Sequence, residues 1–106
     1  MANDTFRALA HPMRRDIVER LADGPATVGE ATRNLGVSKP TLSRHLKILE
    51  EAGLVVRVIE GRTHRLSLDV DPLEEAQTWL ARQRAQWARM FDVVDDYLAE
   101  QKREKT

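Results

Sequence analysis

The sequence predicts a mainly α-helical fold with one β-hairpin and a long C-terminal helix. Three observations lead to this prediction. Apolar residues recur every three or four positions over most of the chain, two β-rich runs meet at a short turn near residue 61, and a heptad pattern fills residues 72–101. The 106 residues are about one domain's worth of chain, so we expect a single domain over residues 1–106.

Composition narrows the possible function classes. The chain has no cysteine, which excludes disulfides, thiolate metal sites and thiol-based redox sensing. Its first ten residues lack the basic and apolar regions of a signal peptide, and no run of about 18 apolar residues could span a bilayer. We therefore expect a cytoplasmic protein with no membrane partner. The net charge is zero, but residues 1–68 carry 11 Lys and Arg against 8 Asp and Glu, whereas residues 69–106 carry 6 against 9.

The first two helices are predicted on either side of a His-Pro pair. Asp4 or Thr5 can cap a short helix that carries Leu9, and this helix stops ahead of Pro12 because the residue before a proline is pushed out of the helical region. Pro12 then opens a second helix, where its missing N–H costs nothing. We expect His11 to cap this helix or to pack against it rather than to bind a metal ion.

A third helix is predicted from a capping box. Thr27 and Glu30 form the T-x-x-E pattern, in which the hydroxyl and the carboxylate satisfy free backbone N–H groups at a helix start. We expect this helix to run for about two turns and to end at Leu35-Gly36. Val37 then makes the bend into the next helix.

The fourth helix is predicted to begin after Ser38, whose side chain can cap it, and Pro40 is tolerated within its first turn. Gly53 ends the helix, and Leu54 is placed to pack back against the last turn. Its apolar residues repeat at the spacing that faces a core. They are Leu42, Leu46 and Leu49.

Two β-rich runs follow, LVVRVIE and THRLSL, and Gly61 and Arg62 join them as an antiparallel hairpin. The two helices and the bend, at about residues 28–52, form a helix-turn-helix. The hairpin, at about residues 54–68, stands where a winged variant carries its wing. The predicted fold class is therefore a winged helix-turn-helix.

The last helix, at about residues 72–101, would be roughly 45 Å long, which is more than the rest of the domain needs. Its apolar residues follow a heptad seam. We therefore expect a homodimer that pairs through this C-terminal dimerisation helix, with contributions from the first helix. The predicted interface residues are Phe6, Leu9, Leu73, Leu80, Trp87, Met90, Phe91, Val94 and Leu98.

The fourth helix turns a basic and polar face away from its leucines. Arg and Lys donate to guanine in the DNA major groove, and Ser and Thr reach base edges or phosphates. A solvated surface would explain a basic helix alone, but the bend, the caps and the basic hairpin together favour double-stranded DNA as the partner. The predicted DNA-binding residues are Ser38, Lys39, Pro40, Thr41, Ser43, Arg44, His45 and Lys47 on the helix, and Arg62, His64 and Arg65 on the hairpin, which would meet the DNA backbone or the minor groove.

Residues 5–70 resemble the ArsR/SmtB family of bacterial winged helix-turn-helix repressors. The resemblance lies in the segments ALAHPMRRDIVERL, TVGEATRNLGVSKPTLSRHLKILEEAGLV and EGRTHRLSL. It implies a homodimer whose terminal helices pair and whose two recognition helices enter successive major grooves of an imperfect palindrome. It also implies repression by blocking polymerase, and a place at the bacterial nucleoid.

The chain departs from the metal-sensing members of that family, which bind metal through cysteines beside the third helix or through Asp, His and Glu on the last helix. Here the last helix has no histidine and the third-helix segment no cysteine. A solvated acidic face, or pairing with arginines, explains the remaining acidic residues better than a cation site. These are Asp92, Asp95, Asp96 and Glu100. We expect no metal site and no cofactor, as in family members that repress constitutively or regulate their own gene.

The sequence alone leaves other interpretations of the function open. Trp79 and Trp87 could line a pocket for a small apolar effector near the dimer helices, although core filling is the commoner role of such residues. A winged helix could also serve as a protein-interaction adaptor, because a fold does not fix a function. An enzyme is disfavoured, because the chain has none of the common nucleotide-binding, hydrolase or metalloprotease motifs.

Overall fold

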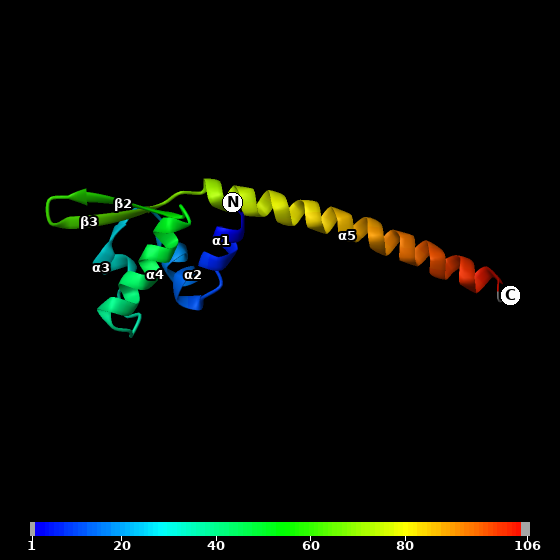
Figure 1. Cartoon of the computed structure of the whole chain (residues 1–106), viewed down its shortest axis with the longest axis horizontal. Helices are drawn as coiled ribbons and strands as arrows, with labels where there is room; N and C mark the ends of the chain where they lie inside the picture. The colour runs from blue at the N-terminus through cyan, green and yellow to red at the C-terminus, as the bar shows by residue number, and fades with distance from the viewer. Residues whose placement is uncertain (1, 105–106) are drawn as a thin grey trace. The chain divides into compact units, whose positions relative to one another are not determined.

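The computed structural model describes residues 2–104 and divides the chain into two compact units, one up to Ala76 and one from Gln77 onward (Figure 1). The predicted single domain over 1–106 therefore stays a prediction, and its residues 1, 105 and 106 lie outside the described residues. The elements are α1 (Ala2–Ala8), α2 (Pro12–Leu21), β1 (Ala26–Thr27), α3 (Val28–Ala31), α4 (Lys39–Glu51), β2 (Val55–Glu60), β3 (Thr63–Leu68) and α5 (Asp71–Glu104).

Helices α1 and α2 differ in how well the sequence predicted their starts. Helix α1 already begins at Ala2, so the predicted cap at Asp4 or Thr5 is wrong. Thr5 is instead a buried residue within the helix, with 1% of its surface exposed, and its carbonyl accepts the N–H of Leu9 just beyond the helix end. The predicted start of α2 is confirmed. His11 Nδ1 accepts the Met13 N–H at 3.1 Å, so His11 is the cap, and Pro12 is the first helical residue.

Helix α3 is one turn long, so the predicted two turns ending at Leu35-Gly36 are wrong. The chain leaves the helix after Ala31 because the Thr32 hydroxyl donates to the Val28 carbonyl at 2.6 Å and Asn34 takes a left-handed φ of 61°. Thr27 caps the helix as predicted, since its hydroxyl oxygen accepts the Glu30 N–H at 3.2 Å. The same Thr27 hydroxyl donates a hydrogen bond to the Glu30 carboxylate at 2.9 Å.

The predicted hairpin is confirmed, but it belongs to a three-stranded antiparallel sheet in the order β1-β3-β2. Strands β2 and β3 pair from Val55 with Leu68 to Glu60 with Thr63, around a two-residue turn in which Gly61 has a φ of 63°. The additional strand β1 pairs Ala26 with Leu66. It was missed because two residues carry no alternating pattern and their partner lies 40 positions away.

The core of the first unit lies between the sheet and helices α2, α3 and α4, which gather on one side of the hairpin (Figure 1). Leu46 and Leu49 are buried as predicted, whereas Leu42 is half-buried. The end of α4 is a Schellman motif: the Leu54 N–H donates to the Leu49 carbonyl and Gly53 has a φ of 76°. The buried cluster is Ala8, Ile17, Leu21, Ala31, Leu46, Leu49, Leu54, Val55 and Leu66.

Helix α5 has 34 residues, a length of roughly 51 Å, and its predicted extent over residues 72–101 is confirmed to within three residues. Leu73 packs in part against the core of the first unit. In the second unit every large apolar side chain of the helix is exposed. These residues are Trp79, Leu80, Trp87, Met90, Phe91, Val93, Val94, Tyr97 and Leu98. No helix among residues 2–104 is both long enough and apolar enough to cross a membrane.

Candidate nucleic-acid interface

Helix α4 presents a polar and basic face because its leucines are fixed inside. Ser38 caps the helix: its Oγ accepts the Thr41 N–H at 3.4 Å and shares a hydrogen bond of 2.9 Å with the Thr41 hydroxyl. With Leu46 and Leu49 buried, the residues on the other side of the helical wheel point outward. The exposed members of the predicted DNA-binding set on this helix and its cap are Ser38, Lys39, Pro40, Ser43, Arg44 and Lys47.

Two cations on this face, Arg44 and Lys47, differ in whether they form an ion pair. Lys47 forms a long, exposed ion pair with Glu51, with 3.9 Å between Nζ and the carboxylate. Within residues 2–104, the side chain of Arg44 has no hydrogen-bond or ion-pair partner. An exposed pair of this kind contributes little to stability, so the charge of Lys47 also remains available to an anionic ligand.

Two predicted residues of α4, Thr41 and His45, are half-buried rather than exposed. The ring of His45 lies against α2, with its centroid 4.5 Å from that of His11. Arg14 donates to His45 Nδ1 at 3.1 Å, because a guanidinium has no acceptor and the ring nitrogen must be the acceptor. Burial lowers the pKa of His45, and its electrostatic interactions with His11, Arg14 and Arg44 lower it further. A DNA contact of His45 stays a prediction.

Arg14 also joins α4 to the end of α1. Its Nε donates to the Ala8 carbonyl at 2.6 Å and its Nη2 to the Arg7 carbonyl at 3.2 Å. These carbonyls belong to the last turn of α1, where backbone acceptors lack partners within the helix. One guanidinium therefore connects the first helix, the second helix and the middle of α4.

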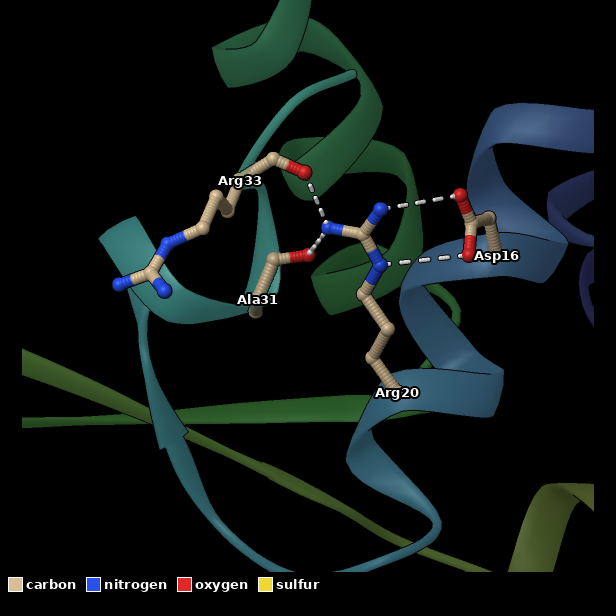
Figure 2. A network of polar contacts seen from close by, with 4 residues as sticks. All are labelled: Asp16, Arg20, Ala31 and Arg33. Carbon is tan, nitrogen blue, oxygen red and sulfur yellow. Dashed lines mark hydrogen bonds and ion pairs between the residues drawn. The ribbon is translucent and has the colours of Figure 1, made fainter.

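Arg20 makes a second connection, between α2 and the bend of the helix-turn-helix (Figure 2). It donates to the Ala31 carbonyl at 3.2 Å and to the Arg33 carbonyl at 2.7 Å, and it pairs with Asp16 one turn earlier at 3.3 Å. The side chain of Arg33 points away from this network (Figure 2). The bend between α3 and α4 is thus held from outside by a residue of α2.

The wing carries its basic residues on two faces. Arg62, in the turn, and Arg65, on β3, are exposed, whereas His64 is half-buried. Because successive strand residues point to opposite sides, Arg65 and His64 lie on opposite faces of the sheet. The structure therefore does not bring the three predicted wing residues together on one surface.

Arg57 of β2 holds the wing to the end of α4. Its Nε and Nη2 donate to the two carboxylate oxygens of Glu50 at 2.7 and 3.2 Å, and its Nη1 donates to His64 Nδ1 at 3.0 Å. A cleft of about 480 Å³ lies beside these groups. It is lined by Thr27, Val28, Gly29, Arg57, Arg62, Thr63 and His64.

The sequence pattern did not indicate that Arg14, Arg20 or Arg57 belongs to the site. Their partners lie up to 31 positions away, so no local pattern of charge or spacing indicates these contacts. The sequence contains one weak indication for Arg20, because Asp16 and Arg20 stand at the i, i+4 spacing of a helical ion pair. Among the residues that the structure describes, no three His, Asp or Glu side chains gather in a way that could hold a metal ion.

The comparisons with known proteins agree on one class of protein. The model of a family described as "Helix-turn-helix domain" matches residues 9–58. The chain is similar to the HTH-type transcriptional regulator Rv2034 of Mycobacterium tuberculosis, with 47% identity over 77 residues, 73% of this chain and 72% of the relative. It is also similar to the transcriptional repressor SdpR of Bacillus subtilis, with 32% identity over 78 residues, 74% of this chain and 87% of the relative.

A solved crystal structure of an ArsR family transcriptional regulator, RHA00566, superimposes with a TM-score of 0.77 at 34% identity. The match covers 81% of this chain and 94% of the solved one. It therefore extends well beyond the segment that the helix-turn-helix model matches.

Proposed function

The chain belongs to the ArsR-type family of winged helix-turn-helix transcriptional regulators, and from this premise we propose that it is a homodimeric repressor that binds an imperfect palindrome. DNA binding and transcriptional regulation, rather than catalysis, are the activities of this family. The observation that carries the proposal is the exposed basic face of α4, set on a helix whose leucines are buried in the core.

We assign different roles to the residues of this face. Ser43 and Arg44 are the base readers, because both are exposed on the N-terminal half of α4 and Arg44 has no partner within residues 2–104. Lys47 holds a phosphate, since its ammonium is a flexible point charge that only a long ion pair engages. Arg62 and Arg65 add salt-dependent contacts from the wing to the DNA backbone or the minor groove.

The proposal of a homodimer rests on the exposed apolar face of α5. At about 100° per residue, the large apolar side chains from Trp79 to Leu98 cover an arc of roughly 160°. A helix with such a face is not stable alone in water, because its packing supplies most of its stability. The arc is also wider than the seam of a two-stranded coiled coil, so the partner must offer more than one helix. Residues of a second α5 and of α1, such as Phe6 and Leu9, fit this need.

Dimer formation can be tested by inserting a charge into this face. Val94→Glu places a carboxylate within the arc, whereas Ala99→Glu places the same charge about 140° around the helix, on its polar side. We expect sedimentation equilibrium to give a dimer for the wild type and for Ala99→Glu, and a shift to monomer for Val94→Glu. A monomeric wild type at micromolar concentration would contradict the homodimer.

We also propose that no metal ion controls this repressor and that it acts on its own gene. The absence of cysteine and the lack of a three-ligand cluster within residues 2–104 support the first part. The second part rests on the likeness to family members without metal sites. A small apolar effector that binds near Trp79 and Trp87 remains a second hypothesis, since both residues are exposed on α5.

The experiment that tests the function measures binding to the DNA upstream of the protein's own gene, and to unrelated DNA, at two salt concentrations, with and without EDTA. We expect tight, sequence-selective binding that EDTA leaves unchanged and that falls about a thousandfold between 50 and 200 mM salt. Weak binding at both salt concentrations with no preference for sequence would favour a protein-interaction adaptor. Release of DNA on addition of a metal ion would overturn the metal-independent repressor.

A further inference from the structure

The bend between α3 and α4 depends on a side chain that belongs to neither helix. Arg20 of α2 uses its Nη1 for the Ala31 and Arg33 carbonyls, and its Nε and Nη2 for the two carboxylate oxygens of Asp16 (Figure 2). Four of the five guanidinium N–H groups are therefore engaged. Only 30% of the side-chain surface is exposed.

The two carbonyls that Arg20 binds are acceptors the backbone leaves open. Ala31 ends α3, so its carbonyl has no partner within that helix and lies at the negative end of the helix dipole. The Arg33 carbonyl belongs to the bend itself and accepts from no other group among the described residues. Two residues of the bend, Asn34 and Gly36, have left-handed φ values of 61° and 71°. Arg20 thus supplies the hydrogen bonds that hold an otherwise weakly bonded turn.

The buried leucines do not hold the end of α4 that enters this bend. Leu46 and Leu49 lie in its C-terminal half, and no residue from Lys39 to His45 is fully buried. With Leu46 fixed in the core, the free end of α4 can tilt only about that residue. Ser43 lies three residues from Leu46, roughly 4.5 Å along the helix axis, so a tilt of about 10° would move it by about 0.8 Å, which exceeds the tolerance of about 0.5 Å for a functional side chain.

We propose that Arg20, oriented by Asp16, is a positioning residue of the DNA-binding site. It fixes the direction in which α4 leaves the bend, and so aims Ser43 and Arg44 at the base edges, without contacting DNA itself. This inference rests on the proposed function. Arg20 thus differs in role from the arginines proposed to contact DNA, because hydrogen bonds within the protein already engage its donors.

The test compares Arg20→Gln with Arg15→Gln. Arg15 lies on the same helix and also donates to a backbone carbonyl, that of Leu9 at 2.8 Å, but it does not contact the bend. We expect Arg20→Gln to lose about tenfold in affinity for the operator, while its affinity for unrelated DNA and the slope of log affinity against log salt stay at the wild-type values. Arg20→Lys keeps a cation at the two carbonyls and should recover part of the loss.

Arg15→Gln should bind the operator as the wild type does. If Arg20 touched a phosphate, Arg20→Gln would instead weaken binding to all sequences and lower the salt slope by about one. That result, or unchanged operator affinity, would overturn the inference while leaving the proposed function intact. Lack of selective binding by the wild type would count against the proposed function alone.

Amide hydrogen exchange without DNA decides the structural part of the inference separately. We expect Arg20→Gln to speed exchange at residues 32–38 at least several-fold, with the core helices and the sheet unchanged. Asp16→Asn, which leaves Arg20 in place but removes its carboxylate partner, should give a smaller effect at the same residues. Wild-type exchange rates in the bend of Arg20→Gln would show that Arg20 does not hold it, whatever the DNA measurements give.

Discussion

The ring of His45 on α4, the helix proposed to bind DNA, lies 4.5 Å from the ring of His11, the residue that caps α2, and accepts a hydrogen bond from Arg14. This arrangement requires a neutral His45, because a protonated imidazole has no acceptor. Burial, together with electrostatic interactions with His11, Arg14 and Arg44, lowers the pKa of His45 accordingly. In the unfolded chain its pKa returns to about 6.5.

From this we predict that acid destabilises the protein through His45. Below about pH 6.5 the unfolded chain binds a proton at this residue that the folded chain does not, so the stability that His45 contributes above that pH is lost as the pH falls. The free energy of unfolding of the wild type should therefore decrease between pH 7 and pH 5 more than that of His45→Gln. Urea unfolding at several pH values measures both, and equal pH dependence would contradict the prediction.

Arg44→Ala is predicted to weaken operator binding by about 1–3 kcal/mol and to relax sequence preference at one position, because a lost bidentate contact to a base removes discrimination there. Titration of an operator and of its single-base variants measures the affinity and the preference together. Arg82→Ala, which removes an exposed cation from α5, serves as the control and should change neither. If Arg44→Ala keeps its preference, Arg44 is not a base reader.

Lys47→Ala is predicted to weaken binding to operator and unrelated DNA alike, and to lower the salt slope by about one, since it removes one phosphate contact. Its partner Glu51 provides the matched control. Glu51→Ala breaks the same exposed ion pair and leaves the ammonium in place, so it should not weaken DNA binding. A loss confined to the operator in Lys47→Ala would mean that Lys47, rather than Arg44, reads a base.

Gly53→Ala is predicted to lower the free energy of unfolding by about 1 kcal/mol, because Gly53 ends α4 with a left-handed φ of 76°. Crowding is not the reason, as an added Cβ would meet its nearest neighbour, Pro72 Cγ, at an ordinary 3.7 Å. Gly53→Asn should cost less. Gly29→Ala, within helix α3 and without a positive φ, should be neutral or stabilising. Denaturant unfolding at one protein concentration compares the three variants.

The sequence predicted those parts of the fold that local chemistry determines. The cap at Ser38, the proline start of α2, the glycine end of α4 and the turn at Gly61 each depend on a few adjacent residues, and all are present. Strand β1 and the length of α3 were missed, because the first depends on distant partners in β3 and the second on the Thr32 hydroxyl and the φ of Asn34.

The candidate site likewise has features that the local sequence predicted and features that depend on distant residues. The periodicity of α4 indicated which side chains face outward, and Lys39, Ser43, Arg44 and Lys47 are exposed. It did not indicate that His45 packs against His11, or that Arg14, Arg20 and Arg57 connect the site to the rest of the first unit. The contacts that join α1, α2 and α4 or the wing connect residues between 6 and 34 positions apart and follow from tertiary structure alone. Whether the exposed residues contact DNA stays a prediction.

The ion pair between Arg57 and Glu50 has a thermodynamic consequence for DNA binding. It secures the wing to the end of α4 with two hydrogen bonds, and a third reaches His64 on the other strand. Both elements proposed to bind DNA are therefore ordered before DNA arrives, so their conformational entropy is lost during folding rather than during association. Calorimetry should accordingly give a heat-capacity change for binding that matches the surface area buried in the interface. Folding coupled to binding would give a larger change.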